Sequence, residues 1–117
     1  MMKRFLLLAP AVVLAACGSS PVLPPQEAAS LPPLVYVSSA RQPDDIASCL
    51  GDRLSRVQTS NENGVTTLSI GSRSHSSYYV WLTPSHGGTV IKVVHPDGAP
   101  DDPPEEEMRF DIARCAT

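Results

Sequence analysis

Residues 78–95 read Tyr-Tyr-Val-Trp-Leu-Thr-Pro-Ser-His-Gly-Gly-Thr-Val-Ile-Lys-Val-Val-His, and they carry the clearest signal of secondary structure in the chain. Two runs rich in aromatic and β-branched residues, 78–82 and 89–95, flank the turn-forming residues 83–88. Such side chains pack well on a pleated surface, whereas Gly and Pro interrupt it. The stretch therefore predicts an antiparallel hairpin in which Leu82 lies opposite Thr89, Val80 opposite Ile91 and Tyr78 opposite Val93.

A second hairpin is expected just before the first. Residues 57–60 and 65–70 flank Asn61-Glu62-Asn63-Gly64, and Asn-Gly is a strong signal for a tight hairpin turn. The pairing expected here has Ser60 opposite Val65 and therefore Val57 opposite Leu68. Pairing Ile70 with Tyr78 joins the two hairpins into a four-stranded meander whose apolar side chains share one face. The opposite face is then mostly polar with an aromatic patch, and it carries Gln58, Thr67, Ser69, Tyr79, Trp81, Val90, Lys92 and Val94.

Amphipathic segments flank the four strands on either side. Residues 43–56 begin with Pro43, which suits the first position of a helix, and repeat apolar side chains at helical spacing. In the last segment Asp102 suits a helix cap, and Met108, Ile112 and Cys115 form an apolar stripe. The expected fold class is α+β, in the order α-β-β-β-β-α over residues 43–117, with both helices on the apolar face of the sheet.

The first 16 residues have a different character. Lys3 and Arg4 precede an apolar run, 5–16, that is too short to cross a bilayer as a helix. This arrangement is typical of a secretory signal peptide, and its end, Leu14-Ala15-Ala16-Cys17, resembles a bacterial lipobox. The resemblance implies a bacterial lipoprotein in which residues 1–16 are removed and Cys17 carries the lipid anchor. Because Gly18 and not Asp follows Cys17, it also implies the periplasmic face of a Gram-negative outer membrane.

Residues 17–42 link this signal to the first predicted helix and are rich in Pro, Ser and Ala. Proline excludes a helix and favours extended chain, so we expect a tether between the lipid and the domain at 43–117. Leu34-Val35-Tyr36-Val37 is a β-prone exception within this segment. It could dock on the domain or add an edge strand.

Cys49 and Cys115 remain once Cys17 is assigned to the lipid. Both fall on the apolar stripes of the predicted helices, and an exported protein meets an oxidising compartment, so we predict a disulfide between them. From Cys17 onward the chain carries seven Lys and Arg against twelve Asp and Glu. This acidic balance argues against nucleic acid as a partner and against electrostatic docking on anionic membranes.

The outward-facing Tyr79, Trp81 and Lys92 form the candidate binding face, since exposed aromatic groups can stack on sugars or anchor a protein. Trp81 could instead complete a second small core under residues 34–37. A metal ion held by His75, His95 and Asp97 is conceivable. The expectation for the three histidines of the chain, His75, His86 and His95, is instead a position on the surface. The acidic residues of 97–107 lack the ligand spacing of a calcium loop and suit a solvated helix start.

Catalytic motifs do not emerge from the sequence. There is no Gly-x-Ser-x-Gly elbow, phosphate loop or Cys-x-x-Cys pair, so we expect neither an enzyme nor a cofactor. The expected role is non-catalytic binding or scaffolding in the periplasm, with attachment to the membrane through the lipid on Cys17 and an envelope protein or glycan as partner. A small-ligand or glycan binder, and an inhibitor or accessory factor of an envelope enzyme, are the alternatives.

Overall fold

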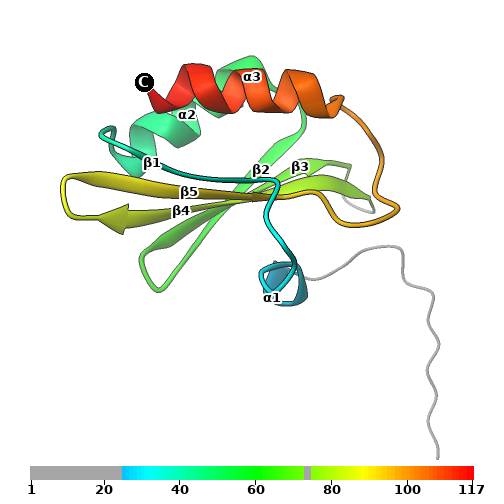
Figure 1. Ribbon diagram of the computed structural model, residues 1–117, viewed down its shortest axis with the longest axis horizontal. Helices are drawn as coiled ribbons and strands as arrows, with labels where there is room; N and C mark the ends of the chain where they lie inside the picture. Colours follow the sequence, from blue (N-terminus) through cyan, green and yellow to red (C-terminus); the bar gives the residue numbers. More distant parts are fainter. Residues whose placement is uncertain (1–24, 73–74) are drawn as a thin grey trace, which may run out of the picture.

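The computed structural model describes residues 25–72 and 75–117 as a five-stranded antiparallel sheet with helices on both faces. The strands are β1 (Val35–Ser39), β2 (Val57–Glu62), β3 (Val65–Gly71), β4 (Ser76–Ser85) and β5 (Gly88–Val94), in the spatial order β1-β5-β4-β3-β2. Helices α2 (Pro43–Arg53) and α3 (Glu105–Ala116) cover one face, and the short α1 (Pro25–Ala28) lies on the other (Figure 1). The α+β class is confirmed. The predicted signal peptide, lipobox and Cys17 lie outside the described residues.

The sheet has five strands, so the prediction of a four-stranded meander is wrong by one strand. Residues 35–39 form β1, which pairs with β5 along its whole length, and the Leu34 amide donates to the Val93 carbonyl. Residues 34–37 were expected either to dock on the domain or to add an edge strand, and the structure shows the edge strand. The tether expected over 17–42 is accordingly wrong from residue 25 onward, because α1 and β1 both pack on the sheet.

The strand faces were predicted correctly, but two of the three registers differ. The β3–β4 pairing has Ile70 opposite Tyr78, as expected. In the β4–β5 hairpin, Leu82 lies opposite Ile91 and not Thr89, because β4 extends through Pro84 and Ser85 to a tight turn at residues 86–87. The β2–β3 hairpin likewise closes more tightly, around Asn63 and Gly64, whose φ angles are +54° and +84°. Both shifts are by two residues, which leaves every side chain on its predicted face.

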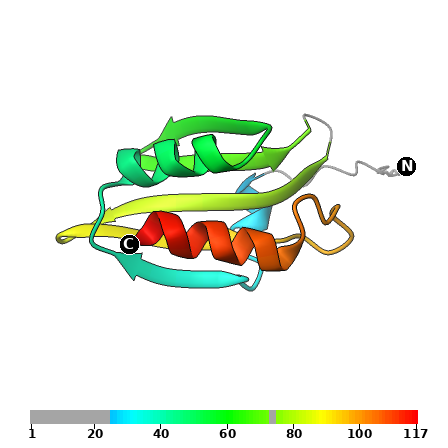
Figure 2. The same cartoon turned by 90° about the horizontal axis from the view of Figure 1, so that it is seen from above.

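The main core lies between the sheet and the pair α2–α3. Figure 2 shows these two helices side by side above the strands, with α3 following the β1 edge. Their apolar stripes meet the inward side chains of β3, β4 and β5 in one continuous cluster. Its fully buried members include Ile46, Leu50, Leu68, Tyr78, Val80, Leu82, Ile91, Val93 and Met108.

Several bonds fasten the two helices to each other and to β1. The disulfide predicted between Cys49 and Cys115 is present, with Cα atoms 5.6 Å apart. Arg53 Nε donates to Asp111 Oδ1 at 3.0 Å across the same helix pair. At the end of α3, the Arg41 guanidinium donates to the Cys115 carbonyl and the Ser39 hydroxyl to that of Ala116. The last carbonyls of a helix have no partner within it, so these bonds satisfy them.

Helix α3 begins later than the sequence suggested. Its first residue is Glu105 and its cap position is Pro104, so Asp102 is not the cap. The Asp102–Pro103 peptide is cis, and the Pro103 carbonyl accepts the Tyr78 hydroxyl at 2.6 Å. The prolines therefore prolong the loop, and a strand side chain fixes its position. Helix α2 does begin at Pro43, as predicted.

Candidate functional site

The predicted binding-face residues Tyr79, Trp81 and Lys92 all lie on the face of the sheet opposite α2 and α3, which we call the outer face. Lys92 pairs with Trp81 and not with Tyr79, because of the two-residue shift in register. The Lys92 ammonium lies 5.6 Å from the centroid of the Trp81 ring and also donates to the Ala29 carbonyl. The rings of Tyr79 and Trp81 are tilted, with centroids 6.0 Å apart.

Tyr79 is not available for binding, which corrects the prediction of an open aromatic patch. Its side chain is 2% exposed, in a second small core with Ala28 and Val94. Leu31 and the partly buried Trp81 pack against this cluster. The cover comes from α1 and the residues after it, a segment that had been expected to be part of the tether. Trp81 thus has one side on the second core, and the rest of the side chain is open.

An open groove of about 400 Å³ lies beside α1 on the outer face. Trp81 and Lys92 line it together with Tyr36 of β1, Val65, Thr83 and Val90. Tyr36 lies opposite Lys92 and is 67% exposed. Sequence reasoning did not identify Tyr36 as a site residue, because its place beside Lys92 depends on the pairing of β1 with β5. The groove presents apolar and aromatic surface with one positive charge, an arrangement suited to binding and without an evident nucleophile–base pair.

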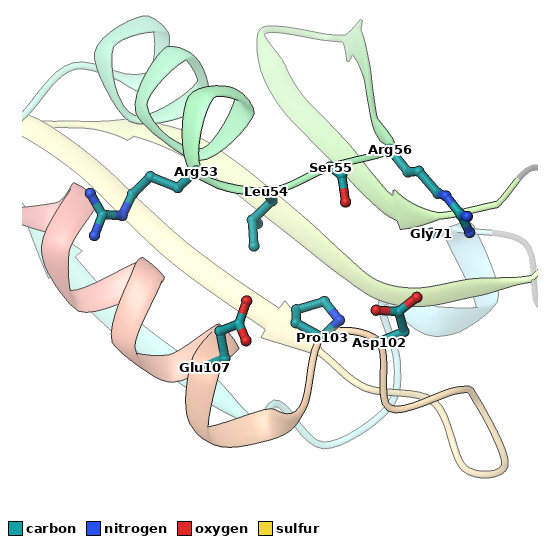
Figure 3. Close-up of a pocket in the computed structure, with 8 residues that line it drawn as sticks. All are labelled: Arg53, Leu54, Ser55, Arg56, Gly71, Asp102, Pro103 and Glu107. Atoms are coloured by element: carbon teal, nitrogen blue, oxygen red, sulfur yellow. The ribbon is translucent and has the colours of Figure 1, made fainter.

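A smaller notch of about 90 Å³ lies between the end of α2 and the loop that leads to α3 (Figure 3). Figure 3 shows the Arg53 side chain reaching towards α3, while Arg56 points to the opposite side. Arg56 has a φ of +58°, and its carbonyl accepts the Gly71 amide. The two guanidinium groups therefore do not converge on a common ligand position, and Arg53 is already bonded to Asp111.

His95 belongs to a cluster at the end of β5. Its ring stacks on Tyr78 with centroids 4.5 Å apart, Nδ1 lies 2.7 Å from the Ser77 carbonyl oxygen, and Nε2 lies 3.0 Å from Asp101 Oδ1. Burial, followed by the nearby carboxylates of Asp101 and Glu105, raises the pKa of Tyr78 to about 12. These contacts hold the loop after β5 against the sheet. Within residues 25–72 and 75–117, His75, His95 and Asp97 do not form a cluster of three or more potential metal ligands.

None of the helices in the described part of the chain is long and apolar enough to cross a membrane. Comparison of the chain with protein-family models, with curated proteins and with solved structures finds no match. The choice of the outer-face groove as the candidate site therefore rests on the chemistry of its side chains. The principal ones are Tyr36, Trp81 and Lys92.

Proposed function

We propose that this protein is a lipid-anchored component of the bacterial envelope with a non-catalytic binding or scaffolding role. The observation that carries the proposal is Leu14-Ala15-Ala16-Cys17 after a short apolar run with a basic start. Because Cys49 and Cys115 are bonded to each other, Cys17 is the cysteine left for lipidation. A stable anchor needs more than one acyl chain, and a lipidated Cys17 would supply two or three.

The fold offers support for an exported protein. A disulfide persists in oxidising compartments, and the Cys49–Cys115 bond joins the two helices of the main core. Gly18 after the lipidated cysteine favours the periplasmic face of the outer membrane as the location. The binding role rests on the outer-face groove, whose aromatic side chains suit a glycan or a protein by chemistry alone. A role as inhibitor or accessory factor of an envelope enzyme would use the same surface.

The anchor is tested by Cys17→Ser in cells labelled with a palmitate analogue. The variant should lose the label and keep residues 1–16, because neither diacylation nor cleavage occurs without the cysteine thiol. The matched control is Cys49→Ala/Cys115→Ala, which removes two cysteines and should still be labelled and cleaved. A Cys17→Ser protein that is cleaved and labelled at the normal level would overturn the proposal.

A further inference from the structure

The described part of the chain begins on the outer-face side of the sheet. Helix α1 packs on this face through Ala28, so the described chain begins at Pro25 on the side opposite α2 and α3 (Figure 1). Seven residues, 18–24, separate Pro25 from Cys17. A fully extended chain spans at most about 3.6 Å per residue, so Pro25 stays within about 30 Å of Cys17.

The side chains beside α1 are those that suit the head-group layer of a bilayer. Tyr and Trp are enriched there because one part of each ring is apolar and the other can reach water. Lysine contributes an apolar stem with a charged end that reaches the polar layer. Tyr36, Trp81 and Lys92 meet in the groove, with Val65 and Val90 completing its apolar surface.

The negative charge of the domain is concentrated elsewhere. Of the twelve acidic residues, three lie in α2, four in α3 and three in the loop between β5 and α3. The remaining two are Glu27 in α1 and Glu62 in β2. The acidic balance that disfavours membrane docking of the whole domain therefore belongs mainly to the helix layer and its loop, and Lys92 is the charged residue of the groove.

We propose that the outer-face groove rests on the phospholipid head-group layer of the membrane that carries the Cys17 lipid. Tyr36 and Trp81 enter the interface, Lys92 reaches the lipid phosphates, and the acidic helix layer faces the periplasm. This inference rests on the proposed lipid anchor. It explains why the described chain begins on the same side as an aromatic groove, since a protein or glycan ligand would not require the two to coincide.

Trp81 is the one tryptophan of the chain, so its fluorescence reports on this face directly. The lipoprotein, purified from membranes, is placed in phosphatidylethanolamine–phosphatidylglycerol vesicles that contain lipid brominated near the top of its acyl chains. Trp81 should lose fluorescence to this lipid and emit at shorter wavelength than in lipid-free protein that begins at Cys17, measured without vesicles. Tyr36→Asp, at an exposed position on the rim of the groove, should restore much of the lost signal.

The matched control moves the reporter to the opposite layer. Phe110 on α3 is 55% exposed, so the variant Trp81→Phe/Phe110→Trp carries its tryptophan on the helix layer. Its fluorescence should not respond to brominated lipid. Equal quenching of the two proteins, or no quenching of Trp81, would overturn the proposed orientation. A Trp81 that ignores brominated lipid but shifts its emission with peptidoglycan fragments would instead assign the groove to a glycan.

A missing natural anchor can be told apart from a wrong orientation. The mass of the Cys17 peptide shows whether the natural lipid is present. If it is not, protein beginning at Cys17 is coupled through that cysteine to a maleimide lipid in the same vesicles, since Cys49 and Cys115 are bonded. Quenching of Trp81 in this coupled protein would support the orientation even where the natural anchor has failed. Absence of quenching in a lipoprotein whose Cys17 peptide does carry the natural lipid would overturn the orientation and leave the anchor unaffected.

Discussion

At the scale of single residues, Tyr78 and Tyr79 show how strand alternation divides neighbours between two cores. Successive side chains of a strand point to opposite faces. Tyr78 therefore packs under α2 and α3 and bonds to Pro103, while Tyr79 packs under α1 with Ala28 and Val94. Tyr36, on the same face as Tyr79 but outside the small core under α1, remains exposed. The three tyrosines thus have different expected contributions to stability.

We expect Tyr79→Ala to lower the free energy of unfolding by about 3 kcal/mol, because it removes a buried ring and leaves a cavity. Tyr36→Ala serves as the matched control and should stay within about 0.5 kcal/mol of the wild type, as exposed positions usually do. Urea unfolding of both variants measures the difference. Equal losses in the two proteins would contradict the second core under α1.

Tyr78→Phe should change how stability depends on alkaline pH. The pKa of Tyr78 is raised from 10 to about 12 in the folded protein, mainly by burial. A group with a raised pKa contributes its full stabilisation below the unfolded value and loses it as pH rises towards the folded one. Each unit of pKa difference corresponds to about 1.4 kcal/mol of stabilisation, and the wild type should lose this stabilisation as the pH rises from 10 to 12. Tyr78→Phe has no hydroxyl to ionise at this position and should not show the loss.

Urea titrations at several pH values provide the measurement for Tyr78→Phe. Near neutral pH the variant should be about 1 kcal/mol less stable, because the bond to the Pro103 carbonyl is lost. The two stability curves should then approach each other above pH 10 and cross before pH 12, because the wild type loses more than its initial advantage of about 1 kcal/mol. Parallel stability curves between pH 10 and 12 would show that ionisation of Tyr78 does not cause the loss of stability.

At the scale of elements, α1 exists because of what it packs against. A helix of four residues is far below the length at which isolated helices are stable. Ala28 is fully buried against Tyr79 and Val94, and the Lys92 side chain bonds to the carbonyl of Ala29. The helix and the groove are therefore coupled, since loss of α1 would open one side of Trp81 to water.

Ala28→Asp should detach α1 because it places a charge in an apolar site, at a cost of about 1–3 kcal/mol. Trp81 emission should shift to longer wavelength as its covered side becomes hydrated. Gln26→Asp adds the same charge at an exposed position of the same helix and should leave the emission unchanged. A red shift in both variants, or in neither, would argue against the contact between this segment and Trp81.

At the scale of the whole molecule, the Cys49–Cys115 bond joins the two helices that precede and follow the strands β2–β5. It spans 66 residues of sequence and ties α2 to α3. Closing a loop of this length lowers the conformational entropy of the unfolded chain. In the chain-entropy account of disulfides, this stabilises the folded state by about 4 kcal/mol. For a small domain whose core alone supplies about 3–5 kcal/mol, this is a large share.

Cys49→Ala/Cys115→Ala should therefore lower the free energy of unfolding by about 4 kcal/mol. Arg53→Gln is the comparison, because it breaks the partly exposed bond to Asp111 between the same helices and should cost less. Thermal unfolding followed by circular dichroism measures both. A double cysteine variant as stable as the wild type would show that packing of α2 on α3 is sufficient without the covalent link.

The sequence by itself determined the features that depend on neighbours along the chain. Alternating apolar residues set the faces of β3, β4 and β5, Asn63-Gly64 set a turn, and the stripes of the two main helices brought the cysteines to the same side. The register of the hairpins is not determined by this pattern, because a shift by two residues keeps every side chain on the same face. The pattern of burial cannot distinguish such alternatives.

The structure of residues 25–39, which form α1 and β1, depends on tertiary contacts. The patch at 34–37 can pair with any open strand edge, and its place on β5 depends on surfaces more than 50 residues away. Gly88 permits the close approach, since a side chain there would collide with the carbonyl of Ser39. Once β1 is in place, α1 covers Tyr79, and Tyr36 reaches Lys92. Local pattern predicts that a segment is sheet-forming, but only long-range packing chooses its edge.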